Sequence, residues 1–148
     1  MAIKKLNKWI FQAGSDNSFR RKVKDSLNPR GSLSGVGLRQ FSDCRSLLNS
    51  CKEFGSPDLY ILERYIPWDI SSRPREDGDG NWRRIADYNE RDKNVPVIMF
   101  SSDTKPIDEH DWKKYSSIRG VYSKLDLSEQ DLRERIFSNL GILASREA

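Results

Sequence analysis

The sequence is poor in the residues on which most metal centres and many covalent catalysts depend. It has one histidine, His110, and two cysteines, Cys44 and Cys51, among 148 residues. A single histidine excludes His-based metal clusters and argues against a histidine-dependent catalytic triad. The cysteines lie seven residues apart within one expected helix, which separates their Cα atoms by about 10 Å, too far for a disulfide. We therefore expect free thiols and no histidine-based site.

Long apolar runs and glycine-rich phosphate loops are also missing. No apolar run approaches the roughly 20 residues that span a bilayer, and residues 1–8 lack the apolar stretch of a signal peptide. The composition is 36% hydrophobic and 32% charged, which is typical of a soluble domain with a real hydrophobic core. We expect one cytoplasmic domain over 1–148, with its core at about 8–141 and a short tail at 142–148.

The net charge of +4 is unevenly placed along the chain. Residues 1–30 contain eight basic and two acidic side chains, a balance of +6, so the remainder sums to −2. A basic end can attract an acidic protein, nucleic acid or an anionic lipid surface, or it can be an ordinary solvated helix face. We expect no membrane insertion, and the candidate basic partner-binding face consists of Arg20, Arg21, Lys22 and Lys24.

Apolar strand patterns alternate with helical patterns along the chain. Strands are expected at 8–13, within 34–41, at 59–62, 95–100 and 120–123; helices are expected at 18–27, 42–54, 82–91 and 128–140, with a polar helix or loop at 108–117. The second helix should bury an apolar face of Cys44, Leu47, Leu48, Cys51 and Phe54. Five strands, each followed by a helix, predict a flavodoxin-like α/β fold, a three-layer sandwich with a parallel sheet.

An irregular insertion is expected at about 68–81, a stretch rich in Ser, Pro, Gly and Asp. Its segment 76–81 superficially resembles a calcium loop, with oxygen-bearing residues at alternate positions. An EF-hand needs glycine at its sixth position and glutamate at its twelfth, where this chain has Trp82 and Tyr88. A polar turn explains these residues, and we expect no metal there.

The segment 57–67 is the most informative part of the sequence. It reads as a buried strand, Leu59-Tyr60-Ile61-Leu62, that ends on the carboxylate of Glu63 and is followed by Pro67. Parallel α/β sheets place binding and catalytic groups at the carboxyl ends of their strands. An acid at this position is therefore a site candidate.

Three motifs in order resemble those of the CheY-like response-regulator receiver domains, and the resemblance covers nearly the whole chain. Residues 62–67 are similar to the family's third-strand motif, 97–102 to its fourth strand and 120–124 to its fifth. The resemblance implies that Glu63 stands where the family has its phosphorylated aspartate. By the same match Ser101 takes the place of the switch hydroxyl, and Lys124 that of the invariant lysine.

The departures from the family pattern argue against its phosphorylation chemistry. The family holds Mg²⁺ with an acid pair after its first strand, but the corresponding stretch here is Gln12-Ala13-Gly14-Ser15. Asp16 comes one or two positions late, where a helix N-cap explains it. Leu125 replaces the proline that usually follows the lysine, and Glu63 is one methylene too long. The resemblance thus implies a degenerate phospho-acceptor pocket, with no catalysis, metal or cofactor: Glu63, Ser101, Lys124 and Asp16.

Two features stay open at this level. Glu63 either pairs with Lys124 across the strand ends or faces solvent as a remnant of lost chemistry. The resemblance also implies a signalling face formed by Trp112, Tyr115, Tyr122 and Leu125, although Trp112 and Tyr115 could instead pack on the sheet. Without a phosphoryl group to bias it, Tyr122 should keep a single fixed rotamer.

These observations predict a pseudo-receiver that is not an enzyme. It would act by protein–protein contacts with a signalling partner, or as a homodimer, in a regulatory or two-component-like pathway. One alternative is a nucleic-acid-binding module that uses the basic first helix, although no helix-turn-helix pattern follows residue 141. The other is a single-domain response regulator that can still be phosphorylated, using Asp16 and Glu63.

Overall fold

The computed structural model contains one five-stranded parallel sheet, in the order β2-β1-β3-β4-β5. It describes residues 8–27, 36–71, 80–102, 107, 109–125 and 127–142. The strands are β1 (Lys8–Ala13), β2 (Val36–Phe41), β3 (Leu59–Glu63), β4 (Val97–Ser101) and β5 (Ile118–Ser123). Each expected strand is present: β1 has the expected ends, and the ends of the other strands differ by at most two residues. Strand β4 ends at the predicted switch residue Ser101.

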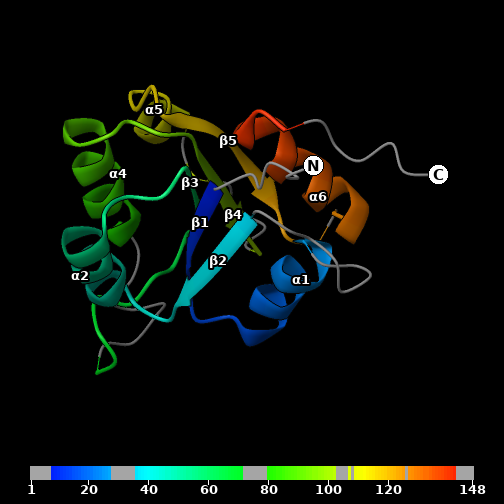
Figure 1. Ribbon diagram of the computed structural model, residues 1–148, viewed down its shortest axis with the longest axis horizontal. Helices are drawn as coiled ribbons and strands as arrows, with labels where there is room; N and C mark the ends of the chain where they lie inside the picture. Colours follow the sequence, from blue (N-terminus) through cyan, green and yellow to red (C-terminus); the bar gives the residue numbers. More distant parts are fainter. Residues whose placement is uncertain are drawn as a thin grey trace, which may run out of the picture.

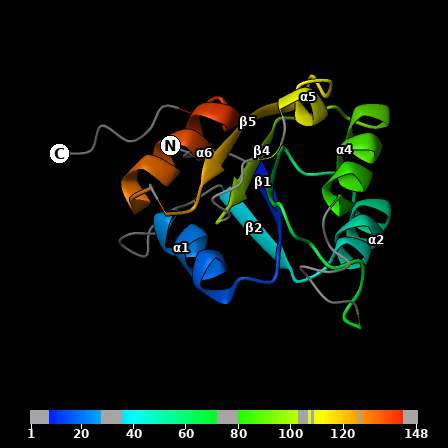
Figure 2. The same cartoon turned by 180° about the vertical axis from the view of Figure 1, so that it is seen from behind.

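Helices cover both faces of the sheet, as Figures 1 and 2 show from opposite sides. One face carries α1 (Asn17–Leu27) and α6 (Glu129–Leu140); the other carries α2 (Cys44–Phe54), α4 (Asn81–Arg91) and the short α5 (Glu109–Trp112). This arrangement confirms the predicted flavodoxin-like, three-layer α/β sandwich. It also brings the carboxyl ends of the strands to one edge of the sheet.

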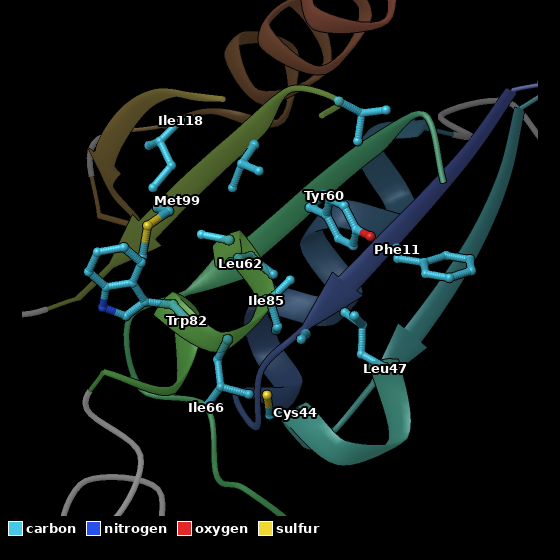
Figure 3. Close-up of a cluster of buried hydrophobic side chains, with 14 of the residues drawn as sticks. Phe11, Cys44, Leu47, Tyr60, Leu62, Ile66, Trp82, Ile85, Met99 and Ile118 are labelled. Atoms are coloured by element: carbon cyan, nitrogen blue, oxygen red, sulfur yellow. The ribbon is translucent and has the colours of Figure 1, made fainter. Parts of the chain in front are cut away.

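Two hydrophobic clusters lie on either side of the sheet. Figure 3 shows the cluster beneath α2 and α4, where Trp82 and Ile85 meet the strand residues Tyr60, Leu62 and Met99. The other cluster packs α1 and α6 against the opposite faces of the same strands. Every residue of β3 and β4 is buried. Burial on both faces explains why these two strands read as nearly unbroken apolar runs.

The helix ends follow the expected capping residues. The Asp43 carboxylate accepts a hydrogen bond from the Ser46 backbone N–H at 2.7 Å, and the Ser128 hydroxyl oxygen accepts one from Asp131 N–H at 3.1 Å. Gly141 closes α6 with φ 73°, a left-handed conformation that favours glycine. Local sequence signals therefore predicted these boundaries well.

The predicted inward face of α2 was wrong at Phe54. Cys44, Leu47 and Cys51 are buried, whereas Phe54 is 64% exposed. The helix ends at Phe54, because Gly55 turns the chain away with φ 96°. The ring lies against the Arg39 side chain of the edge strand β2 instead of in the core. The helical period alone cannot indicate which side chains lie beneath a helix.

The cysteines are free and buried, as expected. Burial raises the pKa of the Cys44 thiol to about 12, which is typical of an inert structural cysteine. The Cys51 sulfur and the Tyr60 hydroxyl lie within hydrogen-bond range of each other, at 3.3 Å. Both thiols therefore belong to the core.

The predicted insertion and tail are described only in part. Residues 72–79, which include most of the calcium-like segment, and residues 143–148 lie outside the described ranges. Trp68 packs against the cluster beneath α2 and α4, and Ile142 packs against the opposite one. Within the described part of the chain, none of the helices combines the length and apolarity needed to cross a bilayer.

Candidate functional site

A small pocket opens where the chain leaves β1, β3, β4 and β5. Its volume is about 150 Å³. All four residues of the predicted degenerate pocket line it, although they are far apart in the sequence. The lining consists of Ser15, Asp16, Glu63, Arg64, Tyr65, Phe100, Ser101, Ser102 and Lys124.

Glu63 and Lys124 form a buried ion pair in this pocket. Lys124 Nζ donates to Glu63 Oε1 at 2.6 Å, with side-chain exposures of 11% and 4%. The Lys124 ammonium also lies 5.1 Å from the ring centroid of Phe19, and its backbone N–H donates to the Ser101 carbonyl at 3.0 Å. Of the two alternatives left open by the sequence, the structure thus has the paired glutamate.

Asp16 supplies a second carboxylate to the same ammonium. Its Oδ2 accepts from Lys124 Nζ at 3.1 Å, while its Oδ1 accepts from the Phe19 backbone N–H at 3.1 Å, which caps α1. Partial burial raises the pKa of Asp16, but the hydrogen bonds from Lys124 and Phe19 outweigh it and hold the pKa below its ordinary value. The predicted helix cap is therefore present, and the same side chain also faces the pocket.

Glu63 has the opposite shift. Burial raises its pKa above the ordinary value of 4.5, and the nearby Asp16 carboxylate adds to that rise. Lys124 opposes the rise without cancelling it. The Asp16 backbone N–H acts in the same direction as Lys124, although its contact falls short of hydrogen-bond geometry. The second oxygen, Oε2, is shielded from solvent and accepts no hydrogen bond from a described residue.

Gly14 makes room for this longer side chain. A Cβ at Gly14 would lie 1.5 Å from Glu63 Oε2 and 2.0 Å from its Cδ. Real Cβ atoms do not approach other atoms so closely, so the Glu63 carboxyl group occupies the space that any side chain at position 14 would need. Sequence reasoning noticed the missing acid at residues 12–15 but missed this coupling. The only sequence signal for the coupling is that a glycine stands at position 14 while Glu63 is one methylene longer than an aspartate.

The pocket does not fit the divalent metal that the fold family implies. Mg²⁺ needs about six oxygen ligands in an octahedral shell at about 2.0–2.1 Å. Here both carboxylates bind the Lys124 ammonium, and Gly14 offers no side chain. Among the described residues, no group of three His, Cys, Asp or Glu side chains could hold a metal. The ammonium occupies the position between the two acids where a cation would have to bind.

The predicted signalling face divides into buried and open parts. Trp112 and Tyr115 are half-buried and pack against the cluster beneath α4, with the Tyr115 ring 5.7 Å from that of Trp82. Leu125, at 76% exposure, is open to solvent. Tyr122 is half-buried, like Trp112 and Tyr115.

The Tyr122 ring is held on three sides. Its centroid lies 5.7 Å from that of Phe100, and the Arg135 guanidinium lies 4.0 Å from the Tyr122 centroid. The hydroxyl reaches back over Gly120, where an added Cβ would come within 2.5 Å of it. These contacts restrain the Tyr122 ring, and its single fixed rotamer stays a prediction.

The basic residues of α1 border a separate groove of about 470 Å³, together with Asn17, Asp25 and Gln40. Arg21 and Lys24 are exposed, and Arg20 is half-buried. Lys22 does not line the groove, because its ammonium donates to the Leu127 carbonyl. The structure therefore brings three of the four predicted basic residues together and directs the fourth toward the start of α6.

Comparison with known proteins finds likeness in structure and none in sequence. No family model and no curated protein matches the chain. A CheY-like receiver domain protein from Methanospirillum hungatei JF-1 superposes with a TM-score of 0.67 at 13% identity, over 90% of this chain and 94% of that one. The N-terminal domain of a response regulator/sensory box/GGDEF protein from Carboxydothermus hydrogenoformans gives 0.66 at 16% identity, over 90% and 94%.

A third structure extends the same likeness. The isolated REC domain of RcsB from Salmonella enterica serovar Typhimurium, determined in the presence of the phosphomimetic BeF₃⁻, gives a TM-score of 0.66 at 17% identity. The match covers 94% of this chain and 92% of that one. Likeness over nearly the full length of both chains, together with the strand order, shows that this chain has the fold of a CheY-like response-regulator receiver domain.

Proposed function

We propose that this chain is a pseudo-receiver, a signalling domain that works without phosphorylation and acts by protein–protein contacts in a regulatory or two-component-like pathway. The observation that carries the proposal is the Lys124 ammonium, bound to Glu63 at 2.6 Å and to Asp16 at 3.1 Å. The pocket thus contains its own cation. A permanent ion pair supports one conformation, where a phosphorylation cycle would need two.

The geometry of Glu63 supports this reading. Phosphoryl transfer needs an accessible nucleophile in line with the leaving group and a metal to neutralise the developing charge. Glu63 is 3% exposed, one of its oxygens is bound to Lys124, and the other lies over Gly14. An attack on a phospho-donor would first have to break the buried pair.

In this proposal the domain passes on its signal through a contact surface for a partner protein. Leu125 is exposed and Tyr122 half-buried at the α5–β5–α6 side, with Tyr122 packed against the α1–α6 cluster and Trp112 and Tyr115 against the cluster beneath α2 and α4. A signalling partner would meet it as a preformed contact site, because the Tyr122 ring is already held by Phe100 and Arg135. No enzymatic step is part of the proposal.

A phospho-donor assay tests the central point. The protein is incubated with acetyl phosphate and Mg²⁺ and analysed by intact-mass spectrometry, beside the same reaction without Mg²⁺ and beside a Glu63→Gln control. We expect no phosphoryl adduct in any sample. A stoichiometric, Mg²⁺-dependent acyl phosphate that is absent from the Glu63→Gln control would overturn the proposal in favour of a working response regulator.

The groove along α1 favours a second candidate function, that of a nucleic-acid-binding module. Arg20, Arg21 and Lys24 line it, and phosphate contacts of this kind make affinity fall steeply with salt. Titration of labelled single-stranded and duplex DNA at several salt concentrations, with Arg20→Glu/Arg21→Glu as the control, separates the two candidates. The pseudo-receiver proposal predicts no salt-dependent affinity that these substitutions remove.

A further inference from the structure

Large hydrophobic side chains gather around one arginine at the amino-terminal end of the sheet. Among the described residues, Trp9 is 41% exposed and Phe54 is 64% exposed. Both rings flank the Arg39 guanidinium, whose central carbon lies 5.5 Å from the Trp9 centroid and 4.7 Å from the Phe54 centroid. We call Trp9, Arg39 and Phe54 the aromatic–arginine patch. It lies at the opposite end of the strands from the Glu63 pocket.

The patch is shaped by the register of two neighbouring strands. Trp9 in β1 pairs with Gly37 in β2, and an added Cβ at Gly37 would come within 2.5 Å of the Trp9 ring. The missing side chain lets the ring lie against the backbone of β2. Arg39 follows two positions later on the same side of β2 and meets Phe54 from the end of α2. Three separate segments thus present one surface.

Its composition is that of a protein contact surface. Trp, Phe and Arg are enriched in interface centres, and Trp and Arg are among the residues that most often dominate binding energy. Isolated exposed hydrophobic residues are common and need no explanation, but two rings around one guanidinium form a contiguous patch. The other two large exposed hydrophobic residues among those described, Ile70 and Leu125, are aliphatic and have no ring for a cation to stack on.

The charged groups at the patch have no ion-pair partner within the described part of the molecule. Arg39 forms no ion pair with a described residue, and neither does Glu53, the exposed residue next to Phe54. The patch therefore offers a cation between two rings and an anion at its border. A surface that carries both signs can complement a second copy of itself about a two-fold axis, since each contact then occurs twice.

We propose that the aromatic–arginine patch is the contact surface of a symmetric dimer of this chain. Arg39 of each copy binds Glu53 of the other, and Trp9 and Phe54 pack across the two-fold axis. The edge strand β2, which has no buried residue, lies beside this contact. The inference goes beyond the proposed function and does not depend on the Glu63 pocket, so either can fail without the other.

Reciprocal charge exchange tests the dimer. Sedimentation equilibrium over a concentration series should show that the wild-type chain dimerises. Arg39→Glu and Glu53→Arg should each weaken dimerisation by at least about tenfold, because each places like charges opposite one another, and Phe54→Ala should do the same by removing an anchor. An equimolar mixture of Arg39→Glu and Glu53→Arg should regain the dimer, because both contacts in the mixed pair again join opposite charges.

Controls keep the test specific. Ile70→Ala removes an exposed hydrophobic side chain outside the patch, and Lys52→Glu changes a neighbouring exposed charge of α2; neither should alter dimerisation by more than about twofold. Circular dichroism checks that every variant is folded.

Three outcomes would overturn the proposal. A wild-type chain that stays monomeric up to about 1 mM would leave the patch to a foreign partner that presents a carboxylate. A dimer indifferent to Arg39→Glu, Glu53→Arg and Phe54→Ala would use another face. A mixture that fails to regain the dimer would remove the two-fold pairing of Arg39 with Glu53.

Discussion

The two ends of the sheet treat charge in opposite ways. At the carboxyl end, Lys124 is ion-paired with both Glu63 and Asp16, and the Glu63 side chain is almost completely shielded from solvent. At the amino end, Arg39 lies between two exposed rings and forms no ion pair with a described residue. In receiver folds the carboxyl end is where binding chemistry is expected. Here that end is closed by its own side chains.

Glycine has the same steric role at both ends, with different consequences. Gly14 admits the Glu63 carboxyl group and Gly37 admits the Trp9 ring, and an added Cβ would clash in each place. Glu63 has nowhere to move because it is buried and ion-paired, whereas Trp9 borders solvent. A close contact therefore becomes a structural constraint only when the neighbouring side chain cannot move.

Removal of the Lys124 ammonium should have the largest effect on stability. Lys124→Met leaves Glu63 as an unpaired buried charge, and we expect the free energy of unfolding at neutral pH to fall by about 3–5 kcal/mol. Urea unfolding followed by circular dichroism measures it. The loss should shrink as pH falls, because Glu63 without Lys124 takes up a proton more readily. A loss below about 1 kcal/mol, typical of surface pairs, would contradict the closed pocket.

Gly14→Ala should have the second-largest effect on stability. The new Cβ must displace the Glu63 carboxyl group within a packed pocket, which should lower the free energy of unfolding by about 1–3 kcal/mol. A double-mutant cycle with Glu63→Ala provides the control. In the absence of the long side chain the alanine should cost little, so the two substitutions should be strongly non-additive. Additive effects would show that Gly14 and Glu63 are not coupled.

The pH dependence of stability should show a smaller effect of Glu63. Its raised pKa means that the folded state binds the proton more tightly than the unfolded state, whose value is near 4.5. The free energy of unfolding should therefore fall as pH rises from about 4.5 through the folded-state pKa, and then level off. Asp16 acts in the opposite sense. Its contribution to the free energy of unfolding is present above about pH 3.8 and is lost as pH falls through its lowered pKa.

Glu63→Gln isolates the Glu63 contribution, because it keeps the shape of the side chain and removes its titration. Unfolding curves for both proteins between about pH 3 and pH 8 give the difference. We expect the fall above pH 4.5 to be absent from the variant. Parallel curves for the two proteins would mean that Glu63 titrates at its ordinary value.

Gly37→Ala should have the smallest effect on stability. The added methyl group must push the Trp9 ring away, but this ring is 41% exposed and can swing into solvent, so we expect a change within about 0.5 kcal/mol. Dimerisation should weaken nonetheless, because the ring leaves the aromatic–arginine patch. A loss of stability as large as that of Gly14→Ala would break the distinction between the two ends.

The fold and part of the pocket could be predicted from local signals. The apolar runs of β3 and β4 and the caps at Asp43 and Ser128 depend on neighbouring residues, and each appeared where expected. The placement of Glu63 and Lys124 at one edge followed from the rule that parallel strands end together, whereas the sequence left their pairing open. Phe54 was misplaced for a complementary reason. Its periodicity was right, but the half-exposed edge strand and Arg39 beneath it are a tertiary property.

The sequence by itself determined a parallel α/β sandwich and the identity of the side chains at its strand ends. It also showed that residues 12–15, at and directly after the end of β1, include no acidic side chain. Only the tertiary structure decided that Glu63 lies over Gly14 and that Trp9, Arg39 and Phe54 meet. These contacts join segments about 15 to 50 residues apart. They depend on strand order, on register and on how the end of α2 is placed over β2, and no local pattern encodes those features.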